Sequence, residues 1–224
     1  MPKPSKGTDE SRRRRVAIWL DLDWGLKREL EVYAGFQSYA DRAGCESTID
    51  PAVERTLVPN GEEIPYDGVV ARVTPEMAEA ARLGGVPVVN VWLHSPVDGI
   101  PSVVADFEAS GAMAAAHLLG RGFRQFGFLG FQRLKDVSLQ LKGFQSALRK
   151  GGFPCSVYRF PHGLLSGSAV GWEEFVTGLR AWIDTWKPPI GIVVSDDLYC
   201  RFLIDACRSK GLNVPTDVAI VGSD

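Results

Sequence analysis

Cysteine and histidine are scarce in this sequence, which has four cysteines and three histidines among its 224 residues. The cysteines lie far apart without a C-x-x-C pair, and the histidines show no H-x-x-x-H spacing, so neither a zinc site nor a redox pair is indicated. Because 45% of the residues are hydrophobic and can form a large core, we expect free thiols rather than disulfides. The sequence therefore predicts no metal and no cofactor.

Long apolar runs are also missing. No run approaches the ~20 residues that a membrane-spanning helix needs. The run at 16–20 is shorter than the ~7–15 residues of a signal-peptide core. The formal net charge of −2 gives no general attraction to nucleic acid or to anionic lipid. We therefore expect a cytoplasmic protein without membrane contact.

The motifs of common enzyme classes are absent as well: there is no G-x-S-x-G, no G-x-x-x-x-G-K-[ST] and no H-E-x-x-H. Gly127 and Gly130 fall within or at the end of an expected strand, not in the strand-to-helix turn that holds a pyrophosphate. Asp196 and Asp197 are neighbouring carboxylates, but adjacent residues at the start of a helix point in different directions. We predict that the chain is not an enzyme and has no catalytic residues.

What the sequence does contain is a regular alternation of buried strands and helices. Apolar runs such as 16–20 are typical of parallel strands that are buried on both faces. Thr74 and Pro75 suit the first positions of a helix, and the two glycines at 84–85 would end it. Strands are predicted at 16–20, 67–72, 87–93, around Val103, around Phe126, and at 156–160, 191–194 and 218–221, with helices at 27–42, 74–84, 109–120, 138–150, 172–186 and 198–210.

This alternation predicts an α/β architecture, with parallel sheets and helices on both faces. Residues 45–65 are harder to interpret and leave room for a short edge strand and a second helix. The resulting total of about nine strands is too large for one lobe with such regular connections. We therefore predict an N-terminal lobe at 16–124 and a C-terminal lobe at 125–224, with a crossover near 121–125. Residues 1–15, which combine Pro, Ser, Lys and Arg, are predicted to form a disordered basic tail.

Ligands of open parallel sheets bind beyond the carboxyl ends of the strands. Arg72, His94 and Asp197 are among the residues that we expect at that edge. Carboxylates accept hydrogen bonds from sugar hydroxyls, a guanidinium donates paired bonds, and an aromatic ring covers an apolar C–H face. Asp106 and Asp197 have a second interpretation, because each could cap the helix that follows it.

One long pattern in the middle of the chain is more specific. The strand and acidic turn at 103–111, the A-x-H-L-L helix at 115–119 and the glycine-bounded strand at 122–130 resemble the hinge-side signature of sugar-sensing repressors of the lactose/galactose repressor family. The resemblance extends over about 16–224 and is greatest to one branch, the xylose operon regulators. In that branch a pair of sugar-sensing lobes precedes an AraC-type helix-turn-helix domain. The further matching segments are 16–28, 67–72, 87–91, 143–144, 152–155, 182–191, 196–207 and 214–224.

The resemblance implies a type I periplasmic-binding-protein-like fold, in which each of two lobes has a parallel sheet flanked by helices. It implies the sugar-sensing domain of a transcription regulator that responds to xylose or a related monosaccharide by lobe closure, and that forms a homodimer. By position, Asp197 and Asp224 match carboxylates that contact the sugar, while Arg28 and Arg72 match basic pocket positions. The candidate ligand-binding residues are Asp23, Trp24, Arg28, Arg72, His94, Phe131, Asp197 and Asp224.

The sequence departs from the family pattern at both ends. Fifteen polar, proline-containing residues at the start cannot form the three helices of an N-terminal DNA-binding domain. The pattern of the family would continue beyond Asp224, so we expect the C-terminal part of the second lobe and the DNA-binding domain to be missing, and DNA to be bound only through that absent domain. The alternative is a free-standing sugar-binding module of a transport or chemotaxis system, which the lack of a signal sequence disfavours.

Overall fold

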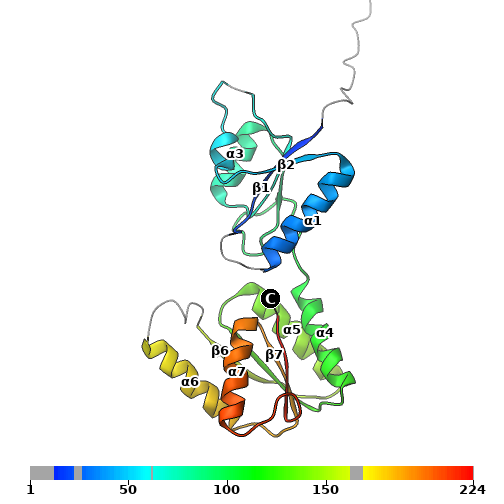
Figure 1. Ribbon diagram of the computed structural model, residues 1–224, viewed down its shortest axis with the longest axis vertical. Helices are drawn as coiled ribbons and strands as arrows, with labels where there is room; N and C mark the ends of the chain where they lie inside the picture. Colours follow the sequence, from blue (N-terminus) through cyan, green and yellow to red (C-terminus); the bar gives the residue numbers. More distant parts are fainter. Residues whose placement is uncertain (1–12, 23–26, 62, 162–168, 224) are drawn as a thin grey trace, which may run out of the picture. The chain divides into compact units, whose positions relative to one another are not determined.

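The computed structural model describes residues 13–22, 27–61, 63–161 and 169–223. The chain divides into two compact units between Val104 and Ala105, and each unit contains a four-stranded sheet (Figure 1). The first unit consists of β1 (Arg15–Trp19), α1 (Lys27–Ala43), β2 (Glu46–Ile49), α2 (Val53–Thr56), β3 (Gly68–Ala71), α3 (Pro75–Gly84) and β4 (Val88–Asn90). The second consists of α4 (Phe107–Gly120), β5 (Gln125–Phe131), α5 (Lys135–Lys150), β6 (Ser156–Phe160), α6 (Ala169–Ile183), β7 (Ile190–Val194), α7 (Asp197–Ser209) and β8 (Val218–Val221).

The sheet of the first unit has the strand order β2-β1-β3-β4, and all its pairs are parallel. Helices α1 and α3 lie on opposite sides of these strands (Figure 1). Ala17 and Ile18 in β1 are buried, as the apolar run predicted. The start of α3 is also as predicted, because Thr74 Oγ1 accepts a hydrogen bond of 3.2 Å from the backbone N–H of Met77. Gly85 ends this helix with φ 65°, a left-handed conformation that glycine adopts without strain.

The sheet of the second unit has the order β6-β5-β7-β8 and is likewise parallel. Helices α4 and α5 lie on one side of it, and α6 and α7 lie on the other (Figure 1). Strand β7 is buried along its whole length, which explains its uninterrupted apolar sequence. Gly127 in β5 makes room for a helix side chain, because a Cβ there would lie 2.6 Å from Ile192 and 3.0 Å from the indole of Trp182.

The boundary between the units differs from the predicted one at 124–125. Helix α4 was expected in the N-terminal lobe, but it packs against α5 and belongs to the second unit. Its contact with α5 is a close one, since Gly111 and Gly143 each face the backbone of the opposite helix. A helix held by backbone-to-backbone packing stays with its partner, so the chain passes from one unit to the other before α4, not after it.

Two other predictions need correction, and one is confirmed. No strand forms around Val103, whose side chain is 69% exposed, although Ser102 makes an isolated bridge to Asn90. The basic tail was predicted to reach Arg15, but this residue begins β1 and its N–H donates to Asp67. The edge strand and short helix expected within 45–65 are present as β2 and α2. Among the described residues, no helix is long and apolar enough to cross a membrane.

Candidate functional site

The carboxyl ends of β1, β3 and β4 carry a polar network in the first unit. Parallel pairing aligns Trp19 with Ala71 and Ala71 with Asn90, so the residues that follow these positions meet at one edge of the sheet. Arg72 follows β3, and its guanidinium carbon lies 4.9 Å from the ring centroid of Trp92, which follows β4. An arginine over an indole face is held by cation–π attraction and by stacking.

Arg72 is also held by two carboxylates. Its Nη1 donates to Glu29 Oε1 at 2.9 Å and to Asp21 Oδ2 at 3.4 Å. The second oxygen of Glu29 accepts a bond of 2.7 Å from the backbone N–H of Asp21, so both oxygens of this carboxylate are used. The side chain of Arg72 is 23% exposed and that of Glu29 is 14% exposed. The cluster is therefore a half-buried, ordered group of charges that is open to solvent on one side.

At the end of β4, next to this cluster, the side chain of Asn90 fixes the loops that carry Arg72 and Trp92. Asn90 is 5% exposed, and its Oδ1 accepts from the backbone N–H groups of Val73 and Trp92 at 3.2 and 3.0 Å. Its Nδ2 donates to Trp92 O at 2.9 Å and to Ser102 Oγ at 3.1 Å. A buried amide with all these bonds sets the loop conformation, because any displacement leaves a polar group unpaired.

The corresponding edge of the second unit carries Asp196 and Asp197 at the start of α7. Asp196 caps the helix, since its Oδ1 accepts a bond of 2.8 Å from the N–H of Leu198. Asp197 is the first residue of the helix, and its carboxylate is exposed and lies against Gly222, at the end of β8, where a Cβ would overlap it. The capping interpretation therefore holds for Asp196, not for Asp197. It also holds for Asp106, which accepts from the N–H of Ala109 at 2.8 Å.

The loop after β5 lies at the same edge of the second sheet. Arg133 has a φ of 61°, the one described non-glycine residue with positive φ, and such conformations are often found at functional sites. Ser195, which follows β7, has a buried Oγ without a hydrogen-bond partner among the described residues. Arg159 in β6 donates to the carbonyl of Phe131 and to Ser138 Oγ.

The structure places the predicted ligand residues unevenly. Asp23, Trp24 and Asp224 lie outside the described residues. Arg28 is exposed in the first turn of α1, next to Glu29 in the sequence. His94 lies at the edge of the first sheet, with its ring centroid 6.4 Å from that of Trp92.

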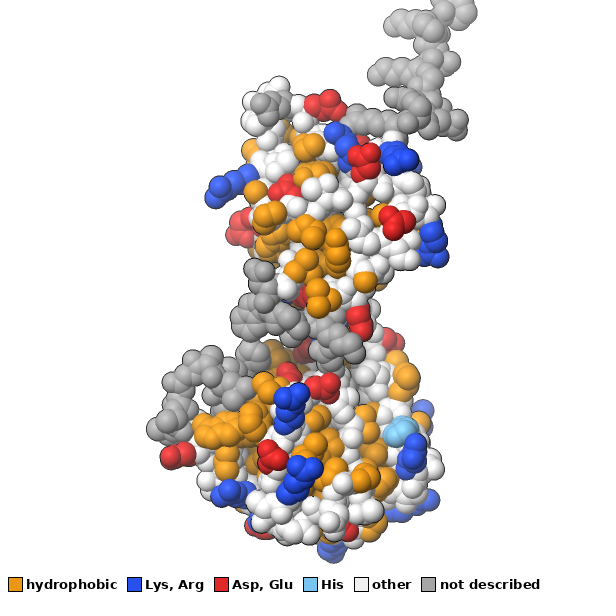
Figure 2. Space-filling model, in the orientation of Figure 1, with side chains coloured by type: hydrophobic (Ala, Val, Ile, Leu, Met, Phe, Trp, Pro, Cys, Tyr) orange, Lys and Arg blue, Asp and Glu red, His pale blue; other side chains and the backbone are white. Residues whose placement is uncertain are grey.

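Phe131 differs from the expectation of an aromatic ring at the edge. It is 7% exposed, and its ring packs on those of Phe160 and Tyr199 at centroid distances of 4.9 and 5.0 Å. It is therefore a core residue beneath the edge of the second sheet. Half-buried aromatic residues reach the surface between α6 and α7, where Trp172 meets Phe202 at 4.8 Å, and Figure 2 shows hydrophobic side chains over α6 beside charged ones over α7.

Sequence reasoning missed three residues of the first cluster: Glu29, Asn90 and Trp92. Glu29 lies 43 positions from Arg72, so nothing local connects them. Asn90 could have been noticed, because an amide within an apolar strand needs partners. Trp92 was included in a predicted strand and was not recognised as a partner of Arg72.

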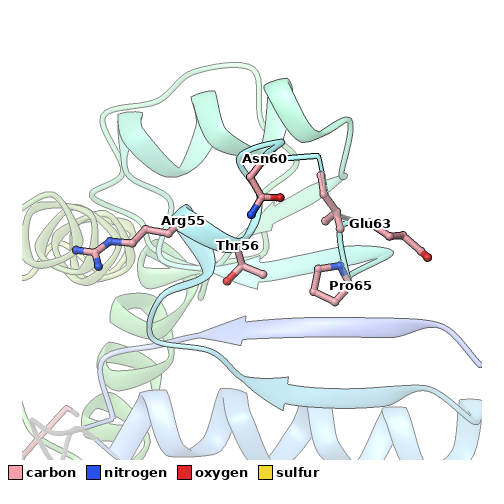
Figure 3. Close-up of a pocket in the computed structure, with 6 residues that line it drawn as sticks. Arg55, Thr56, Asn60, Glu63 and Pro65 are labelled. Atoms are coloured by element: carbon pink, nitrogen blue, oxygen red, sulfur yellow. The ribbon is translucent and has the colours of Figure 1, made fainter.

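A cavity of about 480 Å³ in the first unit lies elsewhere, between α2 and the loop that leads to β3. Figure 3 shows that Arg55 and Glu63 point away from each other, so the charged side chains do not converge on this cavity. Glu63 pairs with Arg15 at 3.5 Å, which places it by the amino end of β1, at the end of the sheet opposite to Arg72. We do not assign the ligand to this cavity.

Metal chemistry and thiol chemistry find no support among the described residues. No group of three or more His, Cys, Asp or Glu side chains there could hold a metal ion. Burial raises the pKa of the Cys200 thiol to about 12, with smaller contributions from the charges of Asp197 and Asp196. Burial also raises the pKa of Cys155 to about 12. These thiols are protonated at neutral pH and are therefore poor nucleophiles.

Comparison with known proteins shows what this arrangement resembles. Residues 115–224 match the family model described as "Periplasmic binding protein-like domain". The catabolite control protein A of Staphylococcus xylosus is 27% identical over 202 residues, which cover 88% of this chain and 58% of that protein. The xylose operon regulatory protein of Haemophilus influenzae is 28% identical over 205 residues, which cover 87% and 51%.

Solved structures extend the likeness over nearly the whole chain. The structure of the xylose-binding transcription activator XylR superimposes with a TM-score of 0.72 at 19% identity and covers 96% of this chain and 55% of that one. The chain has a type I periplasmic-binding-protein-like fold. A LacI family transcriptional regulator from Enterococcus faecium with bound ribose gives a TM-score of 0.65 at 16% identity, with 93% and 77% covered. The chain spans about half the length of the curated relatives it matches, 48% and 58% for two catabolite control proteins.

Proposed function

We propose that this chain is the sugar-sensing domain of a transcription regulator and that its effector is xylose or a related monosaccharide. The observation that carries the proposal is the Arg72 cluster. A guanidinium held by two carboxylates beside an indole, at the carboxyl edge of a parallel sheet, supplies the donors, acceptors and aromatic face that a sugar requires.

Each part of the cluster has a separate role in this proposal. Both hydrogen bonds that Arg72 makes to the described carboxylates come from Nη1, so its other N–H groups donate to sugar oxygens. The carboxylate of Asp21 accepts from hydroxyls, and Trp92 covers an apolar C–H face. Asp197 supplies a further acceptor from the second unit, since it is exposed and makes no side-chain hydrogen bond to the described residues. We propose that the effector acts by shifting the population of the domain toward the state that binds it.

The proposal for the whole protein is a dimeric, cytoplasmic regulator that binds DNA through a further domain and has no enzymatic activity. It is supported by the names of the relatives, which are transcription regulators. Three of the similar solved structures are of LacI regulators, the ribose-bound one among them, and they favour a LacI-type regulator over the AraC-type one that the sequence suggested. The xylose-binding and xylose operon relatives support xylose as the effector.

Isothermal titration calorimetry with a panel of pentoses and hexoses tests this function. We expect saturable one-site binding of D-xylose or another monosaccharide. Arg72→Lys should weaken this binding about tenfold or more, because an ammonium cannot reproduce paired guanidinium bonds. Arg82→Lys is the matched control, since Arg82 forms an exposed pair with Glu79 on α3. Absence of binding by every sugar, or equal binding by both variants, would contradict the proposal.

A further inference from the structure

We infer that Glu29 makes the site selective for uncharged sugars, so that sugar acids and sugar phosphates are rejected. The inference deepens the proposed function and rests on it. Glu29 does not touch the proposed ligand itself but acts on it through Arg72. It is therefore a positioning and specificity-determining residue. The structural basis is the pair of bonds that Glu29 makes with Arg72 and Asp21.

The first step is that Glu29 is fixed in place. It lies in the first turn of α1, where the partial positive charge of the helix N-terminus stabilises a carboxylate. Its two oxygens accept from different segments of chain, Arg72 after β3 and the backbone N–H of Asp21 after β1. With only 14% of its side chain exposed, Glu29 cannot swing into solvent without breaking its bond to Arg72 and leaving this N–H unpaired.

The second step is the charge balance. The cluster joins one guanidinium to two carboxylates, so these three side chains carry a net charge of −1 before any ligand binds. An anionic ligand on Arg72 would stand beside Glu29 and Asp21 in a half-buried place, and like charges in such a place repel strongly. An uncharged sugar meets no such cost, because its hydroxyls donate to the carboxylate of Asp21 and accept from Arg72.

A purely structural role for Glu29 predicts a different result. If Glu29 served only to tie α1 to the sheet, its loss would weaken the binding of all ligands in proportion and would create no affinity for anions. If it sets selectivity, its loss leaves Arg72 with Asp21 alone, at the longer distance of 3.4 Å, and Arg72 becomes a binding point for anions. Competition by an anion therefore separates the two roles.

The experiment uses inorganic phosphate as the probe. The affinity for the tightest-binding sugar of the panel is measured by calorimetry with and without phosphate, at constant ionic strength maintained with chloride. In the wild-type chain we expect the affinity to be unchanged by phosphate. In Glu29→Gln we expect phosphate to lower the sugar affinity about tenfold, which is the effect of a competitor present at roughly ten times its dissociation constant. Asp21→Asn, which removes the other carboxylate, should also become sensitive to phosphate.

Glu46→Gln is the matched control, because Glu46 is exposed and lies at the opposite end of the same sheet, in register with Arg15. It removes the same charge and should stay insensitive to phosphate. Two results would overturn the role of Glu29 while the proposed function stands. One is competition by phosphate in the wild-type chain. The other is that phosphate leaves the sugar affinity unchanged in both Glu29→Gln and Asp21→Asn, with both variants folded. Failure of every sugar to bind would instead contradict the proposed function itself.

Discussion

Gly111 in α4 faces the backbone carbonyl of Gln140 in α5 so closely that a Cβ at Gly111 would overlap this oxygen. The approach is reciprocal, because a Cβ at Gly143 in α5 would overlap the carbonyl oxygen of Glu108 in α4. Next to this crossing, Lys142 in α5 pairs with Glu108 in α4 at 2.7 Å. The two glycines thus allow two helices to pack at backbone distance on one face of the second sheet.

This crossing predicts the effect of one added methyl group. Gly111→Ala should lower the free energy of unfolding by about 1–3 kcal/mol, because the backbone of α5 must move to make room. The gain in helix propensity from alanine, about 1 kcal/mol, opposes this loss but does not remove it. Gly120→Ala in the same helix has no heavy atom within 4 Å of the new Cβ and should not destabilise. Urea unfolding of both variants measures the difference, and equal stability would contradict the close packing.

Substitution of Asp197 should affect ligand binding but not folding. Asp197→Ala should weaken sugar binding by about 1.5–3 kcal/mol, because bound hydroxyls lose a charged acceptor. Its stability should change little, since Asp197 is exposed and makes no side-chain hydrogen bond to the described residues. Asp205→Ala, on the same helix and paired only with exposed Arg208, is the control. Calorimetry and thermal melts give the two readings, and unchanged sugar affinity in Asp197→Ala would remove this residue from the site.

Tyr66 predicts a pH effect on stability. Burial raises the pKa of Tyr66 to about 12, with smaller contributions from its hydrogen bond to Asp50 and from the charge of that carboxylate. Because the pKa in the unfolded chain is about 10, the stabilisation is complete below pH 10 and is lost as the pH rises toward 12.

Tyr66→Phe should therefore be less stable than the wild type at pH 8, and the difference should shrink between pH 10 and 12. Tyr39→Phe, at a side chain that is 59% exposed, serves as the control. Urea unfolding at several pH values measures the difference in stability between each variant and the wild type. A difference that stays constant with pH would show that the Tyr66 proton is not linked to folding.

Assembly gives a further prediction. Because the relatives are transcription regulators, and symmetric dimers are the commonest oligomers, we expect a homodimer with two-fold symmetry. Light scattering should then give a mass near twice the 24.5 kDa of one chain. A mass of one chain at high concentration would refute dimerisation of these 224 residues.

The sequence was informative where local patterns determine structure. The apolar runs predicted most strands, and the Thr74 cap with Gly85 located α3 closely. The prediction around Val103 failed because β-branched residues favour a strand only when a neighbouring strand pairs with them, and only Ser102 makes a bridge there. The place of α4 could not be read from the sequence either, since packing through Gly111 depends on tertiary contact.

For the candidate site, the sequence identified Arg72 as a basic residue at a strand end but not the residues that hold it. Glu29 and Trp92 reach Arg72 through the fold, from a helix and from a neighbouring strand end. Single-sequence patterns contain no information on such long-range contacts. The edge position of Asp197 was foreseen, and the structure adds that its neighbour Asp196 does the capping.

Five of the six tryptophans of this chain belong to the described residues, with Trp19 and Trp92 in the first unit and Trp172, Trp182 and Trp186 in the second, while Trp24 lies outside the described residues. Trp92 lies against the guanidinium of Arg72, whereas Trp182 is 8% exposed and stacks on Tyr158. Intrinsic fluorescence therefore offers two distinct reporters. The emission of Trp92 would respond to any event at Arg72, and that of Trp182 would follow the unfolding of the second core, without the attachment of an external dye.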